Sequence, residues 1–142
     1  MASDTSTEVT FSIAKPADLD TDAVMRVYET SGLAERRPLA EPGRLRNMLD
    51  GSNLIAVAHH SDVLIGIARS ISDFSYATYL SDIAVDSAYQ RQGIGQELIR
   101  LTGETAPQAK IILLSAPAAV EYYPHIGFTR HQSAWTLPAR RN

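Results

Sequence analysis

The sequence predicts a mixed α/β fold in which helices flank a single, mostly antiparallel sheet. Three successive segments of strand character lie between residues 53 and 85, which is typical of antiparallel hairpins. A strand, a helix and another strand then follow around residue 93, which indicates a parallel crossover. With the segments at either end of the chain, the expected order is β-α-α-β-β-β-α-β-α-β.

The first third of the chain predicts a strand and two helices. Val9–Ala14 alternate apolar and polar residues, as a half-buried strand does. Apolar residues then recur at helical spacing after Asp20 or Thr21, either of which is a suitable N-cap, and Gly32 is suited to end that helix. A loop with two prolines leads to a second, short helix that closes on Gly51.

Three strands are expected next. Residues 53–60 and 62–71 form two apolar runs, and residues 60–62 (His-Ser-Asp) provide a hairpin turn between them. Tyr76–Val85 form a third, longer strand.

The last third predicts two helices and two strands. Gly95–Thr105 carry a helical apolar pattern, and the compact run at residues 110–115 (KIILLS) is typical of a strand buried on both faces. A helix begins at Pro117, a favoured first position, and stops near Pro124. Phe128–Leu137 alternate again, which predicts a closing strand with Trp135 in the core or at a dimer contact.

The length of 142 residues suits one domain, and 44% hydrophobic residues are enough for a core. We expect this domain over residues 9–137, after a disordered polar tail over residues 1–8. The tail, MASDTSTE, lacks the basic and apolar regions of a signal peptide.

The composition argues against several kinds of partner and site. A net charge of −3 provides no broad basic surface for nucleic acid, and no apolar run is long enough to span a membrane. The chain has no cysteine, which excludes disulfides, a thiolate zinc site and a cysteine nucleophile, and fits a cytoplasmic protein. His59 and His60 point to opposite faces of a strand, so no metal site is expected.

A glycine-containing turn precedes the helix that follows the third central strand. It reads Gln-Arg-Gln-Gly-Ile-Gly over residues 90–95. Helix N-termini bind anions, and glycines let a phosphate approach the N–H groups. A dinucleotide fingerprint would need glycine at Leu98, and a P-loop would need Lys-Ser/Thr at Gln96 and Glu97, so both motifs fail. The alternative is that the glycines only shape a tight turn.

This turn resembles the central motif of the GNAT superfamily of acetyl-CoA-dependent N-acetyltransferases, Gln/Arg-x-x-Gly-x-Gly/Ala. A second GNAT segment, Asn-x-x-Ala-x-x-apolar-Tyr-x-x-x-Gly-Phe, resembles residues 116–128, although Ala116 replaces its asparagine. The resemblance is strongest over Tyr79–Phe128 and implies a GNAT-like acyl-CoA acyltransferase fold. The matching positions of the second segment are Ala119, Tyr122, Tyr123, Gly127 and Phe128.

The resemblance also implies roles for individual residues. Main-chain groups around Ile83, Ala84 and Val85 would pair with the pantetheine arm of acetyl-CoA, and Tyr123 would be the general acid. Arg36 and Arg37 would border the acceptor pocket, where this role competes with a simpler one in a solvated loop. The N–H groups that would hold the pyrophosphate belong to Arg91, Gln92, Gly93, Ile94, Gly95 and Gln96.

The sequence does not single out one residue as the general base that would take the proton of the acceptor amine. Asp82, Asp73, Glu35 and His125 are candidates, and a water relay is the default because Tyr79 stands where some relatives have a glutamate base.

The expected activity is transfer of an acetyl group from acetyl-CoA to a primary amine, with no metal. Direct attack in a ternary complex is expected because no cysteine can carry an acyl group. The acceptor is expected to be a small molecule, with a protein N-terminus or lysine as the alternative, and a homodimer is a further possibility. The competing classes are a non-catalytic acyl-CoA sensor and a nucleotide-binding regulator.

Overall fold

The computed structural model describes residues 8–140 and shows one five-stranded mixed sheet. The spatial order of the strands follows their order in the chain. Neighbours pair antiparallel except for the last two strands, which are parallel. The strands are β1 (Val9–Ala14), β2 (Leu54–His60), β3 (Val63–Ser72), β4 (Ala77–Val85) and β5 (Lys110–Ile112).

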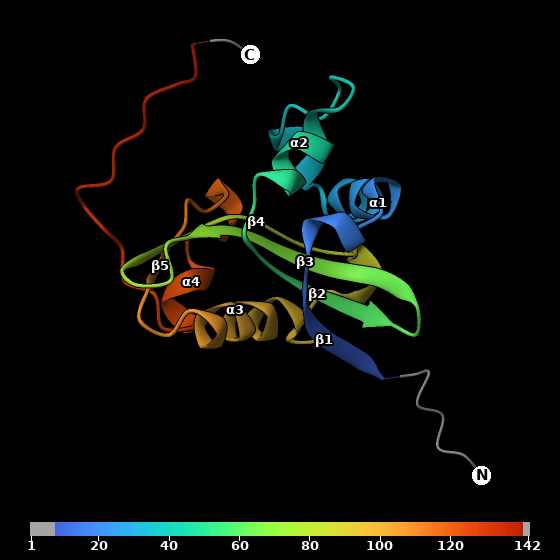
Figure 1. The fold of residues 1–142 in the computed structure, drawn as a ribbon. Helices are drawn as coiled ribbons and strands as arrows, with labels where there is room; N and C mark the ends of the chain where they lie inside the picture. The colour runs from blue at the N-terminus through green and yellow to red at the C-terminus, as the bar shows by residue number, and fades with distance from the viewer. Residues whose placement is uncertain (1–7, 141–142) are drawn as a thin grey trace.

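Helices cover both faces of the sheet, as Figure 1 shows. The two N-terminal helices lie on one face and α3 lies on the other, with α4 beside α3 and β5. The helices are α1 (Thr21–Ser31), α2 (Arg44–Asp50), α3 (Ile94–Thr105) and α4 (Tyr122–His125). Short 3₁₀ turns occur at η2 (Pro16–Asp18), η3 (Leu33–Arg36), η4 (Ser87–Tyr89) and η5 (Pro117–Ala119).

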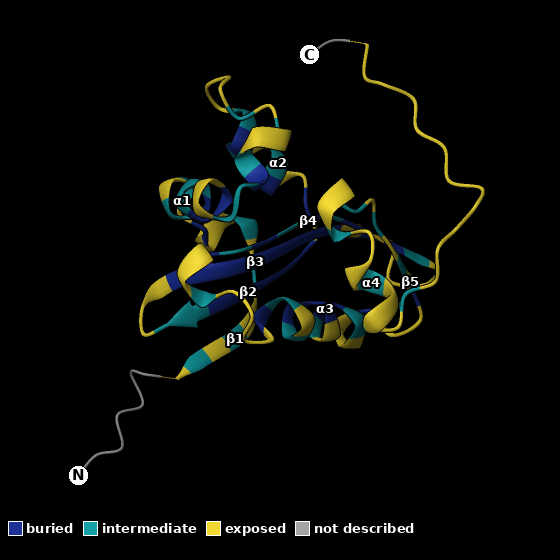
Figure 2. Ribbon diagram, turned by 180° about the vertical axis from the view of Figure 1, so that it is seen from behind, coloured by how far each residue is buried: buried dark blue, intermediate teal, exposed yellow. Residues whose placement is uncertain are grey.

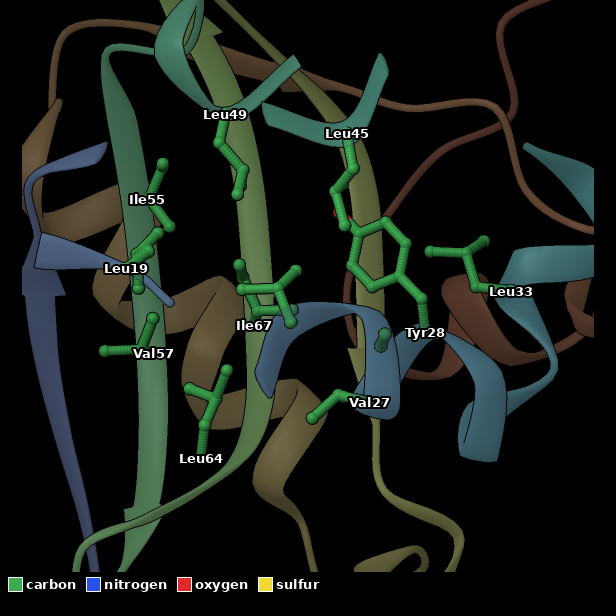
Figure 3. Close-up of a cluster of buried hydrophobic side chains, with 12 residues drawn as sticks. Leu19, Val27, Tyr28, Leu33, Leu45, Leu49, Ile55, Val57, Leu64 and Ile67 are labelled. Atoms are coloured by element: carbon green, nitrogen blue, oxygen red, sulfur yellow. The ribbon is translucent and has the colours of Figure 1, made fainter. Parts of the chain in front are cut away.

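The core has two main layers, one on each side of the central strands (Figure 2). On the α1 and α2 face, Figure 3 shows the fully buried ring of Tyr28 beside Leu33 and Leu45. On the other face, Leu98 of α3 packs over the alanine-rich middle of β2 and β3. Small residues on these strands let α3 approach the sheet closely.

The predicted signals at the ends of the first two helices are confirmed. The Asp20 carboxylate accepts the N–H of Asp22 at 3.2 Å, so Asp20 is the N-cap of α1. Gly32 ends the helix with φ +89°, a left-handed conformation in which glycine carries no steric cost. Gly51 follows α2 as predicted.

A β-bulge interrupts the pairing of β3 with β4. Arg69 lies opposite Asp82, but Ser70 lies opposite Leu80, which leaves Ser81 without a partner in the register. A bulge bends its strand and increases the local twist. Here the extra residue, Ser81, comes two residues after Tyr79, the last residue of β4 that pairs with β5.

The C-terminal part of the sheet differs from the prediction. The strand expected over residues 110–115 stops at Ile112, and it is partly exposed because it lies at the sheet edge, beyond the cover of α1. Phe128–Leu137 form no strand, and Trp135 and Leu137 are 90% and 93% exposed. An alternating pattern becomes a strand only beside a partner edge, and β5 contributes just three residues.

The helix expected from Pro117 to Pro124 is also wrong in detail. It is divided into η5 and α4, with residues 120 and 121 between them. Pro124 lies inside α4, where a first-turn N–H has no helical acceptor to lose. The tail predicted over residues 1–8 lies outside the described residues except for Glu8. No helix within residues 8–140 is both long and apolar enough to cross a membrane.

Candidate active site

A cleft opens where β4 and β5 part. The two strands pair only as far as Tyr79 and Ile112, so the rest of β4 is not paired with β5 along that edge. The cleft has a volume of about 800 Å³, within the range of ligand-binding sites. The walls come from the end of α1, η3, β4, the turn before α3, the segment after β5, and α4.

The cleft brings together two separate parts of the sequence that were predicted to contact acetyl-CoA. Tyr123 lines it, while Gln92 does not. The predicted cofactor-binding residues that line it are Ile83, Ala84, Val85, Arg91, Gly93, Ile94, Gly95 and Gln96.

The N-terminus of α3 presents main-chain N–H groups to this cleft. Gly93 is the N-cap in the left-handed region, with φ +81°, and no side chain caps the helix. The first hydrogen bond of the helix runs from the Glu97 N–H to the Gly93 carbonyl at 3.0 Å. The N–H groups before Glu97 therefore lack helical acceptors, which suits an anion.

Arg91 also lies in the left-handed region, with φ +66°. A non-glycine residue there carries strain of about 1 kcal/mol or more, and such strain collects at functional sites. The preceding turn is fixed by Asp86, whose carboxylate accepts the Ala88 N–H at 2.9 Å and pairs with Arg26 at 2.5 Å. The Ala88 N–H, with Arg26, holds the pKa of Asp86 below its ordinary value against the effect of burial.

The open edge of β4 is partly occupied by a side chain of the chain itself. Gln90 donates from its amide to the Val85 carbonyl at 3.0 Å. A ligand arm that used this carbonyl would have to displace Gln90.

Tyr123 extends from α4 into the cleft and is half-buried. Its ring packs edge-to-face on Tyr122 and on Phe128, with centroids 5.3 and 5.4 Å away. Its hydroxyl makes no hydrogen bond with any residue in 8–140. Burial is the main cause that raises the pKa of Tyr123, and the neighbouring Tyr122 raises it further. The positive charge of Arg36 acts in the opposite direction. The phenol is therefore neutral near pH 7 and can donate a proton or a hydrogen bond.

None of the four candidate bases lines the cleft. Glu35 and His125 are exposed and lie outside its lining. Asp73 lies in the β3–β4 turn, where one carboxylate oxygen accepts the N–H groups of residues 75, 76 and 77. These bonds, first that from Tyr76, lower the pKa of Asp73.

Asp82 lies buried behind the cleft in an ionic network. One of its oxygens accepts from Arg69 Nε at 2.6 Å and from the Tyr28 hydroxyl at 2.7 Å, and the other accepts from Arg37 Nε at 2.6 Å. Burial alone would raise the pKa of Asp82, but Arg69, Tyr28 and Arg37 together hold it below its ordinary value. A carboxylate held this way is a poor proton acceptor.

The two arginines of the η3 region differ in their partners. Arg37 pairs with Asp82 and also donates to the Ser81 carbonyl at 2.8 Å, so it fixes η3 to the bulge. Arg36 is exposed, lines the cleft, and forms no side-chain hydrogen bond or ion pair with the residues in 8–140. Within the same range, no three His, Asp or Glu side chains gather as a metal site.

Comparison with known proteins shows which family has this sequence and fold. Residues 24–136 match the family model described as an acetyltransferase (GNAT) domain. The chain belongs to the GNAT acetyltransferase family. The resemblance noted in the sequence is thereby confirmed, together with the predicted fold class.

The curated relatives of this GNAT domain include two soybean (Glycine max) proteins. It is 32% identical over 120 residues to the probable acetyltransferase TAP2 and 31% identical over 121 residues to the histone acetyltransferase TAP1. Each alignment covers 72% of this chain, and 47% or 51% of the relative. The chain thus spans about half the length of these relatives.

Solved structures agree on the fold. A GNAT-family acetyltransferase from Streptococcus pneumoniae superposes with a TM-score of 0.75 at 20% identity, covering 95% of this chain and all of that one. An aminoglycoside acetyltransferase from an uncultured soil metagenomic sample gives 0.66 at 18% identity, covering 92% and 95%. The agreement extends over nearly the whole chain, so the five-stranded mixed sheet flanked by helices is common GNAT architecture.

Sequence reasoning missed three features of this GNAT site. The bulge at Ser81 leaves no mark in the alternation of β4, since it shows only in the register with β3. Tyr28 resembles any buried aromatic on a helix. Arg69, an arginine inside an otherwise apolar run, was the one available signal that a buried acid had to lie opposite it.

Proposed function

We propose that this chain is an N-acetyltransferase that transfers an acetyl group from acetyl-CoA to a primary amine of a small molecule, by direct attack in a ternary complex. The observation that carries the proposal is a single cleft that contains an uncapped helix N-terminus, an open strand edge and an unpaired tyrosine hydroxyl. Each of these three features suits one part of an acyl-CoA.

The helix N-terminus suits the diphosphate. The N–H groups from Arg91 to Gln96 surround a turn where the Cβ of any residue at Gly93 would meet nothing within 4 Å. A phosphate can therefore approach the backbone without a steric barrier, and the helix dipole favours its charge. The open edge of β4 from Leu80 to Val85 suits an extended arm that pairs with it as an added strand.

Tyr123 is proposed to act at the leaving group. Bound acetyl-CoA supplies a thioester, whose carbonyl carbon bonds to the acceptor nitrogen while the carbon–sulfur bond breaks. The Tyr123 hydroxyl is free to donate to the departing sulfur. An ordinary phenol is already less acidic than an ordinary thiol, whose pKa is about 8.5, and burial raises the pKa of Tyr123 further. Stabilisation of the thiolate by a hydrogen bond is therefore favoured over early proton transfer.

The acceptor nitrogen loses its proton to water in this proposal. No Asp, Glu or His lines the cleft among residues 8–140, and Asp82 is committed to its arginines. Two wider expectations, a homodimer and a cytoplasmic location, stay predictions.

A protein amine is the alternative to a small-molecule acceptor. The structural neighbour from the soil metagenome is described as an aminoglycoside acetyltransferase, which supports small amines. The soybean relative TAP1 is described as a histone acetyltransferase, which favours a protein amine instead. A panel of both kinds of acceptor, assayed by release of free thiol from acetyl-CoA, separates them.

A matched pair of glycines tests the predicted diphosphate site. Gly93 and Gly43 are both helix N-caps with nearly the same backbone, φ +81° and +80°, and a Cβ added at either would meet nothing within 4 Å. Only Gly93 lines the cleft. Valine at either position should therefore cost similar stability, about 1–2 kcal/mol, measured by chemical denaturation.

CoA binding should respond only at the cleft. We expect Gly93→Val to weaken CoA binding at least about tenfold, the worth of one charge-assisted hydrogen bond, while Gly43→Val leaves it unchanged in calorimetry. Equal CoA affinity in both variants would mean that the glycine only shapes the turn. Tight binding of ATP or NAD without binding of CoA would refute the proposed function itself.

The turnover number of Tyr123→Phe tests the proposed role of the Tyr123 hydroxyl at the leaving sulfur. We expect the turnover number to fall by about 10²-fold or more with little change in the KM for acetyl-CoA. Tyr122→Phe, the same chemical change on the adjacent residue, should stay within about twofold of the wild type. Unchanged turnover in Tyr123→Phe would remove Tyr123 from the mechanism, and absence of turnover with every amine despite CoA binding would favour the sensor alternative.

A further inference from the structure

Arg36 occupies a distinctive position in the cleft. It ends η3 and is exposed, and its guanidinium has no hydrogen-bond or ion-pair partner among residues 8–140. The adjacent Arg37 is fully engaged with Asp82 and the Ser81 carbonyl. The two neighbouring arginines therefore differ in role: Arg37 holds η3 in place, and Arg36 is left facing the cleft.

Among residues 8–140, the lining of the cleft carries positive charge and no negative charge. Its charged lining residues in the described part of the chain are Arg36, Arg37 and Arg91. Asp82 compensates Arg37, and Arg91 belongs to the turn before α3, where the diphosphate is expected. Arg36 is thus the uncompensated charge on the η3 side of the cleft.

Arg36 also lies close to the proposed reaction centre. Its charge acts on the Tyr123 hydroxyl, and both residues line the same cleft from different elements, η3 and α4. A small acceptor with its amine near Tyr123 can therefore place another group at Arg36. A guanidinium binds a carboxylate through two parallel hydrogen bonds and repels a second cation.

We propose that Arg36 determines acceptor specificity by binding a carboxylate on the acceptor, so that the substrate is a small amine that also carries a carboxylate. This inference rests on the proposed acetyltransferase function. Arg36 is not part of the proposed acetyl-CoA site, because the diphosphate of acetyl-CoA is assigned to the turn before α3, on a different wall of the cleft. Polycationic amines, which have no group for Arg36 and add positive charge beside it, are disfavoured.

The test uses pairs of acceptors that differ only in the carboxylate. Phenylalanine with phenethylamine, and tyrosine with tyramine, are assayed with acetyl-CoA on the full chain, and spermidine serves as the polycation. The pair that contains the better substrate is used for the comparison. For the wild type we expect kcat/KM to be at least about tenfold higher for its carboxylated member, which is the gain expected from one charge-assisted contact. Arg36→Gln should remove most of that preference, because any effect of the variant on Tyr123 is common to both members of a pair and cancels in their ratio.

Two further variants give this test its controls. Arg91→Gln should raise the KM for acetyl-CoA without changing the preference between acceptors. Arg44→Gln, a surface arginine paired with Glu41 outside the cleft, should change neither. An undiminished preference in Arg36→Gln, a best rate with spermidine, or a change in the KM for acetyl-CoA in Arg36→Gln would overturn the inference.

A binding measurement separates this inference from the proposed function. Calorimetry of the CoA-loaded chain compares N-acetylphenylalanine with N-acetylphenethylamine, which needs no turnover. Tighter binding of the carboxylate in the wild type, lost in Arg36→Gln, supports the Arg36 site even if no amine is acetylated, in which case the proposed function alone has failed. Equal binding of the two compounds overturns the Arg36 site.

Discussion

Replacing Asp82 with asparagine tests whether this buried acid is structural or catalytic. Asp82 has no exposed side-chain surface, and Arg69 opposite it is only 7% exposed. Its two oxygens accept from Arg69, Tyr28 and Arg37 within 2.7 Å. Asparagine fits the same space, but it removes the charge and turns an N–H₂ group toward a donor.

The expected loss of stability is large for so small a change. Removing one partner from a buried ion pair leaves the other charge uncompensated, which costs about 3–5 kcal/mol. Of the two arginines left without their carboxylate, Arg69 is the more deeply buried, with 7% of its side chain exposed against 19% for Arg37. For a chain of 142 residues this loss corresponds to a fall in Tm of roughly 10–20 °C.

Chemical denaturation at pH 7 measures the loss, with Asp50→Asn as the matched control. Asp50 also pairs with an arginine, Arg46, but it is 58% exposed and should change stability by less than about 0.5 kcal/mol. A loss in Asp82→Asn as small as that in the control would refute the structural role. A folded Asp82→Asn variant of normal stability that had lost turnover would instead favour Asp82 as the base.

The pH dependence gives an independent check. The pKa of Asp82 is lowered by folding, so its contribution to stability is complete above its unfolded pKa, about 3.9, and is lost as pH falls through the lower, folded value. The stability difference between wild type and Asp82→Asn should therefore be constant from about pH 5 to 7 and shrink below about pH 4. A difference that grew toward acid pH would contradict the sign of the shift.

Three further substitutions follow from the packing. Gly95→Ala should raise stability by about 0.5–1 kcal/mol and retain CoA binding, because the added Cβ would contact β4 side chains at an ordinary 3.8 Å; weaker calorimetric binding would contradict this. Gly66→Ala should lower stability in denaturation by about 1–3 kcal/mol, since its Cβ would lie 3.2 Å from Leu98 of α3. Trp135→Ser should change Tm by less than about 2 °C because the residue is 90% exposed, and a larger fall would indicate that its segment packs in solution.

The order of the elements was predictable because local signals coincide with tertiary demands. Asp20 and Gly32 fix the ends of α1 by their own chemistry. The two strands around Ser61 are apolar runs, and most of their residues are buried because helices cover both faces of the sheet. The segment Phe128–Leu137 was not predictable in the same way. Its strand pattern is intact, but pairing depends on a neighbouring edge, and the length of β5 cannot be read from the apolar run KIILLS.

The site was predictable where backbone geometry demands a residue type. Gly93 lies in a left-handed conformation at an exposed position, so its identity signals the turn directly. Asp82 was misleading as a base candidate, because its role depends on Arg69 and Arg37, which are 13 and 45 residues away in sequence. Nothing local distinguishes a carboxylate that awaits a proton from one that is already committed to two arginines.

The lack of an acidic or imidazole side chain along the cleft, among the residues that the structure describes, has a kinetic consequence. In the proposed mechanism no such group takes the proton, so the fall in rate toward acid pH would report the ionisation of the acceptor, and each acceptor would bring its own pH profile. At pH 7 an α-amino group is neutral roughly two to three orders of magnitude more often than a lysine side chain, given pKa values of about 7.8 and 10.4. The protein would then select among amines by basicity as well as by shape, and each unit rise in pH above neutrality would raise the neutral fraction of a lysine-like amine about tenfold.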